Sequence, residues 1–157
     1  MPRISPNLWF DNQGLEAAEF YCSIFPNSKI TAVTRYGEAN PDRVGDVLTV
    51  SFELDGQEVV ALNGGPIFQF SEAVSLIIDC KDQAEIDYYW DKLTADGGEE
   101  SMCGWLKDKF GFSWQVVPDR WVEMLNDPDP ERVKRSTEAM YQMRKLDIEA
   151  LEKAAAG

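Results

Sequence analysis

The chain has 157 residues, of which 44% are hydrophobic and 27% charged, a composition typical of a globular protein with a substantial core. Its formal net charge of −13 repels phosphate backbones and anionic lipid surfaces, so we expect neither nucleic acid nor a membrane as partner. The chain has no histidine, which removes the commonest general base and the commonest metal ligand, together with every His-dependent catalytic triad.

The first part of the chain follows the order strand, helix, strand, strand, strand. A short apolar run at 4–10 precedes DNQG, which predicts a turn and a helix N-cap. Apolar side chains then recur at helical spacing over 15–25, until Pro26 ends the helix. Strands are predicted at 29–36, 46–54 and 57–63, the last two joined by Asp55-Gly56, a hairpin signal.

The same order begins again after Gly64-Gly65-Pro66. We interpret these three residues as a tight turn, the alternative being a backbone placed close to a ligand. A buried strand is predicted at 74–80 and an amphipathic helix at 83–95. Strand candidates follow at 100–103, 104–107 and 112–117. The repeat of roughly seventy residues predicts two βαβββ modules, at about 4–65 and about 72–118, in a single domain spanning 1–157.

The remainder, about 119–156, predicts a helical extension. A first helix at 121–125 is followed by a break at 127–130 and then by a stripe of apolar residues at roughly helical spacing. The stripe consists of Val133, Met140, Met143, Leu146, Ile148 and Leu151. We interpret it as a packing face, with a lid over a pocket or a dimer contact as alternatives.

Several motifs that would carry chemistry are missing or weak. There is no GxGxxG and no GK[ST], so neither a dinucleotide fold nor a phosphate-binding loop is supported. Cys22, Cys80 and Cys103 form no CxxC pair and have no histidine to activate them, so we expect inert, reduced thiols. No apolar run reaches the ~20 residues of a membrane span, and we expect a cytoplasmic protein.

Four segments together resemble a known family: FDNQGLEAAEFY, DQAEIDYYW, GGEESMCGWLKDKFGFSWQVVP and RSTEAMYQMRKLDIEALEKA. From about Ile4 to Leu151 the chain is similar to the PhnB-like group, also described as 3-demethylubiquinone 3-methyltransferase-like. The group lies in the vicinal oxygen chelate superfamily of glyoxalases, bleomycin-resistance proteins and extradiol dioxygenases. The resemblance implies an α+β fold in which paired βαβββ modules form a curved mixed sheet around a cavity. It also implies a homodimer.

The superfamily usually places four metal ligands on the concave face, one each from the first and last strands of the two modules. Carried over, these ligand positions fall on Asn7, Asn63, Ser75 and Gln115. Four neutral donors bind a divalent transition ion poorly, and even hard cations usually need carboxylates. We therefore predict no cofactor and no tightly bound metal, and at most a weakly held divalent cation. A methyl donor would need a glycine-rich turn that the sequence lacks.

The resemblance and the strand alternation together predict a ligand pocket. Its predicted residues are Asn7, Trp9, Asn63, Ser75, Trp105, Ser113 and Gln115. In the last strand, Ser113 and Gln115 share one face while Trp114 points to the other. The predicted function is binding of a small polar or aromatic metabolite. The alternative is a metal-assisted enzyme of the glyoxalase or dioxygenase type, for which the sequence identifies no catalytic residue, since nothing shows that Asp46, Glu53 or Glu58 faces inward.

Overall fold

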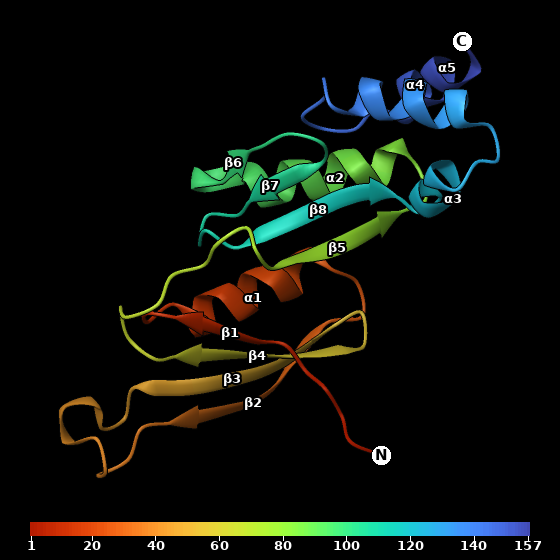
Figure 1. Cartoon of the computed structure of the whole chain (residues 1–157). Coiled ribbons are helices and arrows are strands. Elements are labelled where there is room, and N and C mark those ends of the chain that lie inside the picture. The colour runs from red at the N-terminus through yellow and green to blue at the C-terminus, as the bar shows by residue number, and fades with distance from the viewer. The chain divides into compact units, whose positions relative to one another are not determined.

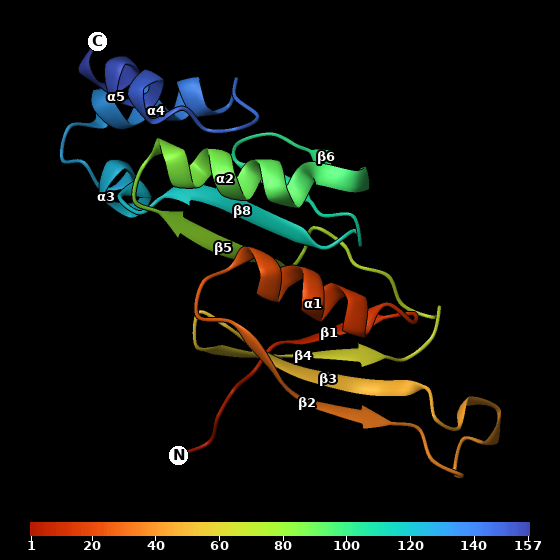
Figure 2. The same cartoon turned by 180° about the vertical axis from the view of Figure 1, so that it is seen from behind.

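A computed structural model describes all of the chain, Met1–Gly157. The residues form two compact units, Met1–Phe70 and Ser71–Gly157, each built on one four-stranded mixed sheet (Figures 1 and 2). The α+β class with two sheets of this kind confirms the fold class predicted from the sequence. None of the helices combines the length and the apolarity needed to cross a bilayer.

Unit 1 contains the first predicted module. Its elements are β1 (Asn7–Phe10), α1 (Gly14–Ile24), β2 (Lys29–Arg35), a 3-10 turn (Pro41–Arg43), β3 (Val47–Leu54) and β4 (Gln57–Asn63). The strand order is β1-β4-β3-β2, with β1 parallel to β4 and the other pairs antiparallel. The core lies between α1 and one face of the sheet, because alternate strand residues such as Val50 and Phe52 are buried with Tyr21.

Unit 2 repeats this arrangement. Its sheet elements are β5 (Ser75–Cys80), α2 (Gln83–Thr94), a 3-10 turn (Ala95–Gly97), β6 (Glu99–Glu100), β7 (Trp105–Lys107) and β8 (Ser113–Pro118). The strand order is β5-β8-β7-β6, and β5 runs parallel to β8 as β1 does to β4. Trp90 of α2 is buried together with Leu106, Trp114 and Val116, so α2 covers one face of this sheet.

The helical extension also belongs to unit 2. It consists of α3 (Trp121–Leu125), α4 (Pro130–Met140) and α5 (Ile148–Ala156). A loop at 141–147 interrupts the apolar stripe predicted from the sequence. A new helix, α5, begins after this loop, because the side chain of Asp147 caps it by accepting a hydrogen bond from the Ala150 amide. Leu146 and Leu151 are fully buried with Val117 of β8, so the stripe is a packing face.

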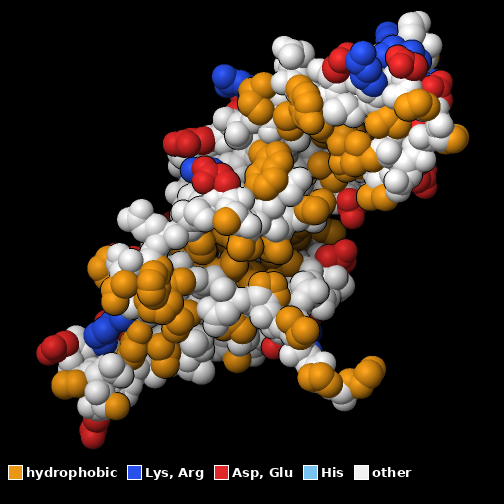
Figure 3. Space-filling view, in the orientation of Figure 1, with side chains coloured by type: hydrophobic (Ala, Val, Ile, Leu, Met, Phe, Trp, Pro, Cys, Tyr) orange, Lys and Arg blue, Asp and Glu red, His pale blue; other side chains and the backbone are white.

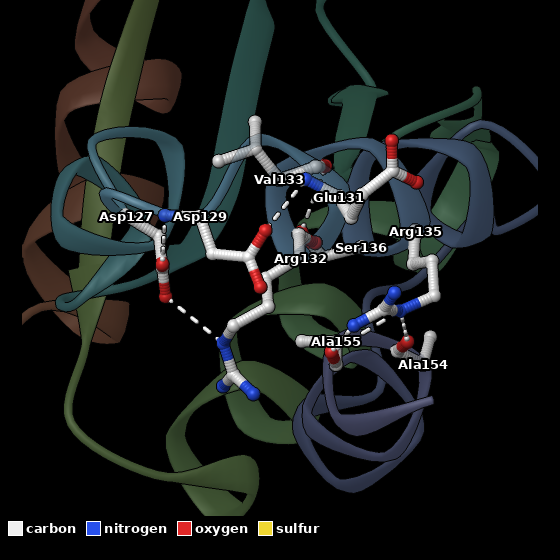
Figure 4. A network of polar contacts seen from close by, with 9 residues as sticks. All are labelled: Asp127, Asp129, Glu131, Arg132, Val133, Arg135, Ser136, Ala154 and Ala155. Atoms are coloured by element: carbon white, nitrogen blue, oxygen red, sulfur yellow. Dashed lines mark hydrogen bonds and ion pairs between the residues drawn. The ribbon is translucent and has the colours of Figure 1, made fainter.

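Polar contacts fasten α4 to its neighbours (Figure 4). Asp129 caps α4 by accepting a hydrogen bond from the Glu131 amide at 3.0 Å, and Asp127 accepts one from Nε of Arg132 at 3.1 Å. The Arg135 guanidinium donates to the Ala155 carbonyl at 2.6 Å, at the C-terminal end of α5. A cation at this end of a helix stabilises carbonyls that have no partner within the helix.

Candidate functional site

One face of the unit 2 sheet is not covered by α2, and we call it the open face. The strand register places Ser75, Ser113 and Lys107 in one row across it, and Ile77, Gln115 and Trp105 in the next. Figure 3 shows hydrophobic side chains exposed over α3 and the neighbouring part of this sheet. The exposed apolar residues of these elements include Ile77, Val122 and Leu125. The open face therefore combines polar and apolar groups.

A pocket of about 440 Å³ lies at the β6–β7 edge of this sheet. It is lined by Glu72, Glu99, Glu100, Ser101, Met102, Cys103, Trp105, Leu106, Lys107 and Ser113. A volume of this size suits a small organic molecule.

Two residues of the predicted pocket, Trp105 and Ser113, line this space together. The ring of Trp105 is half-buried and can supply an apolar wall. Ser113 is only 1% exposed, and its Oγ has no hydrogen-bond partner. A buried hydroxyl without a partner is costly, so Ser113 is the polar group in this pocket that most needs one from a ligand or water.

Ser75 and Gln115 lie beside this pocket on the open face but do not line it. The Gln115 side-chain amide donates a hydrogen bond from Nε2 to Oγ of Ser75 at 2.9 Å. Both side chains are half-buried, and each already has one neutral partner.

Asn7 and Trp9 lie in unit 1, on the face of its sheet away from α1, and Asn7 is exposed. The Trp9 indole donates from Nε1 to the Gly65 carbonyl at 2.9 Å. A Cβ added to Gly64 would lie 2.3 Å from the Trp9 ring, so the glycine pair accommodates this indole. The turn itself lies at Pro66 and Ile67, directly after the two glycines.

The structure does not bring Asn63 onto that face. Asn63 is 4% exposed; its Oδ1 accepts a hydrogen bond from the Gly14 amide at 2.7 Å, and its Nδ2 donates to the Val47 carbonyl at 3.2 Å. Asn63 thus satisfies the first amide of α1, the role that the sequence analysis gave to DNQG. Leu62 of β4 pairs with Trp9 of β1, and Gln115 of β8 pairs with Ile77 of β5. Leu62 therefore occupies the position in unit 1 that corresponds to Gln115 in unit 2.

Replacing Asn63 with alanine is expected to lower the free energy of unfolding by about 2 kcal/mol, because the buried Gly14 amide and the half-buried Val47 carbonyl lose their partner. Urea denaturation followed by circular dichroism measures this loss. Asn7→Ala, on the exposed face of the neighbouring strand, is the matched control and is expected to change stability by less than about 0.5 kcal/mol. Equal effects of the two substitutions would contradict the capping role of Asn63.

Charged residues that the sequence analysis did not place in the pocket also line it. The Lys107 ammonium donates to the Glu72 carboxylate at 2.6 Å, which lowers the pKa of Glu72 and raises that of Lys107. Glu100 accepts a hydrogen bond from Nε1 of Trp90 at 2.7 Å, while Glu99 forms no ion pair within 4.0 Å. Side chains alternate between the two faces over 104–107, which places Lys107 on the same face as Trp105. This alternation was the sequence signal that could have identified Lys107 as a pocket residue.

The lining therefore holds three carboxylates against one ammonium. Glu100 also lies 3.7 Å from the Arg144 guanidinium, so Glu99 is the lining carboxylate that has no ion pair. Its charge favours neutral or cationic molecules over anions, within a chain whose net charge is itself −13.

The donor set does not fit a tightly held divalent metal. The superfamily ligands correspond to positions on the open face of unit 2 and on the face of the unit 1 sheet away from α1. These positions bear Asn7, Leu62, Ser75 and Gln115, none of which is charged. The Gln115 side-chain amide already serves as a donor to Oγ of Ser75. No group of three or more His, Cys, Asp or Glu side chains is arranged to hold an ion.

Comparison with known proteins identifies the family. The family described as 3-demethylubiquinone-9 3-methyltransferase matches residues 2–117. A PhnB protein from Bacillus cereus, of 34% identity, aligns with a TM-score of 0.66 over 74% of this chain and 99% of its own. A Pseudomonas aeruginosa protein, of 19% identity, aligns with a TM-score of 0.62 over 75% of this chain and 98% of its own. No curated protein matches.

A more distant structure shares the fold alone. The fosfomycin resistance protein FosX from Listeria monocytogenes, solved with Mn(II) and a sulfate ion, is 12% identical and aligns with a TM-score of 0.56 over 80% of this chain and 95% of its own. The family match and the PhnB relative agree with the motifs quoted from the sequence. The chain therefore belongs to the 3-demethylubiquinone-9 3-methyltransferase family, the PhnB-like group with the fold of the vicinal oxygen chelate superfamily.

Proposed function

We propose that this protein binds a small polar or aromatic organic molecule in the pocket beside the open face of unit 2, without a tightly held metal. The observation that carries the proposal is the Oγ of Ser113, which is buried, has no partner and belongs to a residue of that pocket. A site built to hydrogen-bond a ligand leaves such a group unpaired until the ligand arrives.

The surroundings of Ser113 support recognition of an amphipathic molecule. Trp105 offers an aromatic surface, and the neighbouring Ser75–Gln115 pair extends the polar strip along the open face. An apolar wall with a few convergent polar groups is the usual composition of a small-molecule site. The homodimer and the cytoplasmic location expected from the sequence belong to the same proposal.

Neither of the two chemical activities associated with the family is supported by the residues of the site. A methyl donor of the adenosylmethionine type usually binds a doubly wound parallel sheet after a glycine-rich turn, and the strand orders here are β1-β4-β3-β2 and β5-β8-β7-β6. Chelation of vicinal oxygens needs an anchored ion, for which the uncharged donor set is poorly suited.

A thermal-shift screen tests the proposal with 2-phenylethylamine, benzyl alcohol and benzoate as probes. At about 100 times its dissociation constant, a bound probe is expected to stabilise the wild-type chain by ~2.7 kcal/mol, seen as a rise in melting temperature. Ser113→Ala is expected to lose most of this rise, whereas Val122→Ala, on the exposed surface of α3, keeps it. Equal rises in both variants would place the binding elsewhere.

Metal analysis provides the complementary test. Protein purified without chelator is expected to contain far less than one divalent ion per chain, and added Mn(II) or Zn(II) alone is expected to leave the melting temperature unchanged. A near-stoichiometric ion, or a large rise with the ion alone, would favour the metal-assisted enzyme instead.

A further inference from the structure

The three cysteines differ in their surroundings. Cys80 is fully buried, and burial, reinforced by nearby carboxylates, raises the pKa of its thiol to about 12. Burial also raises the pKa of the Cys22 thiol. Cys103 is half-buried and is the only cysteine that lines the pocket. Cys103 therefore differs from Cys22 and Cys80, whose surroundings agree with the sequence-based expectation of inert thiols.

The backbone at Cys103 has an unusual conformation, with φ at +61°. The other non-glycine residues with positive φ are Asn27, Asp55 and Asp96, whose side chains tolerate this region best. Cysteine has no such preference, so the surrounding structure must impose the conformation.

The helical extension imposes it. The Cys103 amide donates to the Met143 carbonyl and the Gly104 amide to the Arg144 carbonyl, both at 2.8 Å. The loop at 141–147 is anchored in turn by Gln83 of α2, whose side chain donates to the Leu146 carbonyl at 3.0 Å and accepts from the Ile148 amide at 2.9 Å. The family match ends at residue 117, so the segment that holds Cys103 at the pocket lies outside it.

The pocket around Cys103 has features that point to a ligand. The buried Oγ of Ser113 has no partner, Trp105 offers an aromatic wall, and Glu99 carries a carboxylate without an ion pair. The thiol thus shares a space of about 440 Å³ with a hydroxyl that needs a partner and with the unpaired carboxylate of Glu99.

We propose that Cys103 is a covalent modification site, at which the thiol undergoes exchange with small cationic disulfides bound in the pocket. The proposal rests on the ligand-binding function assigned to the same pocket. The carboxylates attract the cation, and the volume accommodates the half of the disulfide that remains attached.

The exchange is balanced without any further reactant. The Cys103 thiol loses its proton to water, and its Sγ attacks one sulfur of the disulfide. A bond forms between Sγ and that sulfur, the original S–S bond breaks, and the leaving thiolate takes up a proton. Cys103 is oxidised to a mixed disulfide while half of the reagent is reduced to a thiol, and an excess of free thiol reverses the reaction.

Intact-mass spectrometry with peptide mapping tests the proposal at about pH 8, near the pKa of an ordinary thiol. The probes are cystamine, bis(2-hydroxyethyl) disulfide and dithiodiglycolate, which are cationic, neutral and anionic. Each rate is divided by the rate of the same probe with N-acetylcysteine amide, which removes intrinsic differences in reactivity. Cys103 is expected to react first, with cystamine preferred over dithiodiglycolate by about tenfold at low salt and by less at about 0.5 M salt.

Two variants sharpen the test. Glu99→Gln, which keeps the shape of the side chain and removes its charge, is expected to reduce the preference for cystamine about threefold. Cys103→Ser is expected to abolish the fast modification and to leave Cys22 and Cys80 unchanged. Modification of Cys22 at the same normalised rate as Cys103, or no preference among the three probes, would overturn the proposal.

The outcome is separable from that of the proposed function. If Cys103 fails to react selectively while the aromatic probes still stabilise the wild-type chain but not Ser113→Ala, the modification site is refuted and the binding function stands. If Cys103 reacts with the expected charge order while no aromatic probe stabilises the chain, the modification site stands and the pocket's proposed binding of aromatic molecules is refuted.

Discussion

Replacing Asp108 with alanine is expected to lower the free energy of unfolding by about 4 kcal/mol, the largest effect among the substitutions considered. The Asp108 carboxylate is 2% exposed and accepts three hydrogen bonds. They come from the amides of Phe110 and Phe112, at 2.9 and 3.1 Å, and from Nε1 of Trp114, at 2.9 Å. Alanine would leave these three donors without their acceptor, and the Phe112 amide and the Trp114 indole are buried.

Urea denaturation measures this loss, and Asp119→Ala, at an exposed position just after β8, is the matched control. Asp108→Asn is expected to fall between the wild type and the alanine variant, because one oxygen can still serve the loop amides while the new NH₂ group faces the Trp114 donor. A loss below about 1 kcal/mol for Asp108→Ala would contradict the role given to this carboxylate.

The second large effect is expected from Gly104→Ala, which should lower the free energy of unfolding by about 3 kcal/mol. Gly104 has φ at +82°, where an added Cβ is strained. The same Cβ would lie 2.8 Å from the Val116 carbonyl oxygen and 3.1 Å from Cδ1 of Leu146. Because the first neighbour is backbone and the second is packed in the core of the extension, neither can move away cheaply.

Gly111 supplies a control for the backbone conformation alone. Its φ is +85°, yet no atom lies within 4 Å of an added Cβ. Gly111→Ala is therefore expected to cost about 1 kcal/mol, and the difference between the two variants measures the crowding at Gly104. Thermal unfolding should show the same order, with roughly 2–4 °C lost per kcal/mol. Equal losses in both variants would contradict the packing described around Gly104.

Much of the fold could be predicted because the chain repeats local patterns. Alternation marked the strands at 57–63 and 112–117 to within one residue, and the Asp55-Gly56 hairpin joins β3 and β4 as predicted. The break in the apolar stripe could not be predicted from periodicity. Leu146 is apolar and continues the stripe through the loop, while the adjacent Asp147 caps a new helix.

The site was harder to predict than the fold. Ser113 was placed by alternation within a single strand, which is a local signal. The partners of Asn63 were not predictable, because Gly14 lies 49 residues away and a shift of one residue along β4 exchanges the two faces of the sheet. The anchoring of Cys103 by the loop at 141–147 is a similar case, as backbone carbonyls carry no sequence signature.

We propose that the pocket at the β6–β7 edge binds a small organic molecule without a metal. The most direct measurement is a ¹H–¹⁵N correlation spectrum of metal-free protein titrated with 2-phenylethylamine. We expect saturable shifts of the Trp105 indole and of the backbone amides of Lys107 and Ser113, with no added ion required. Shifts confined to residues outside this pocket, or shifts that appear only after a divalent metal is added, would contradict the claim.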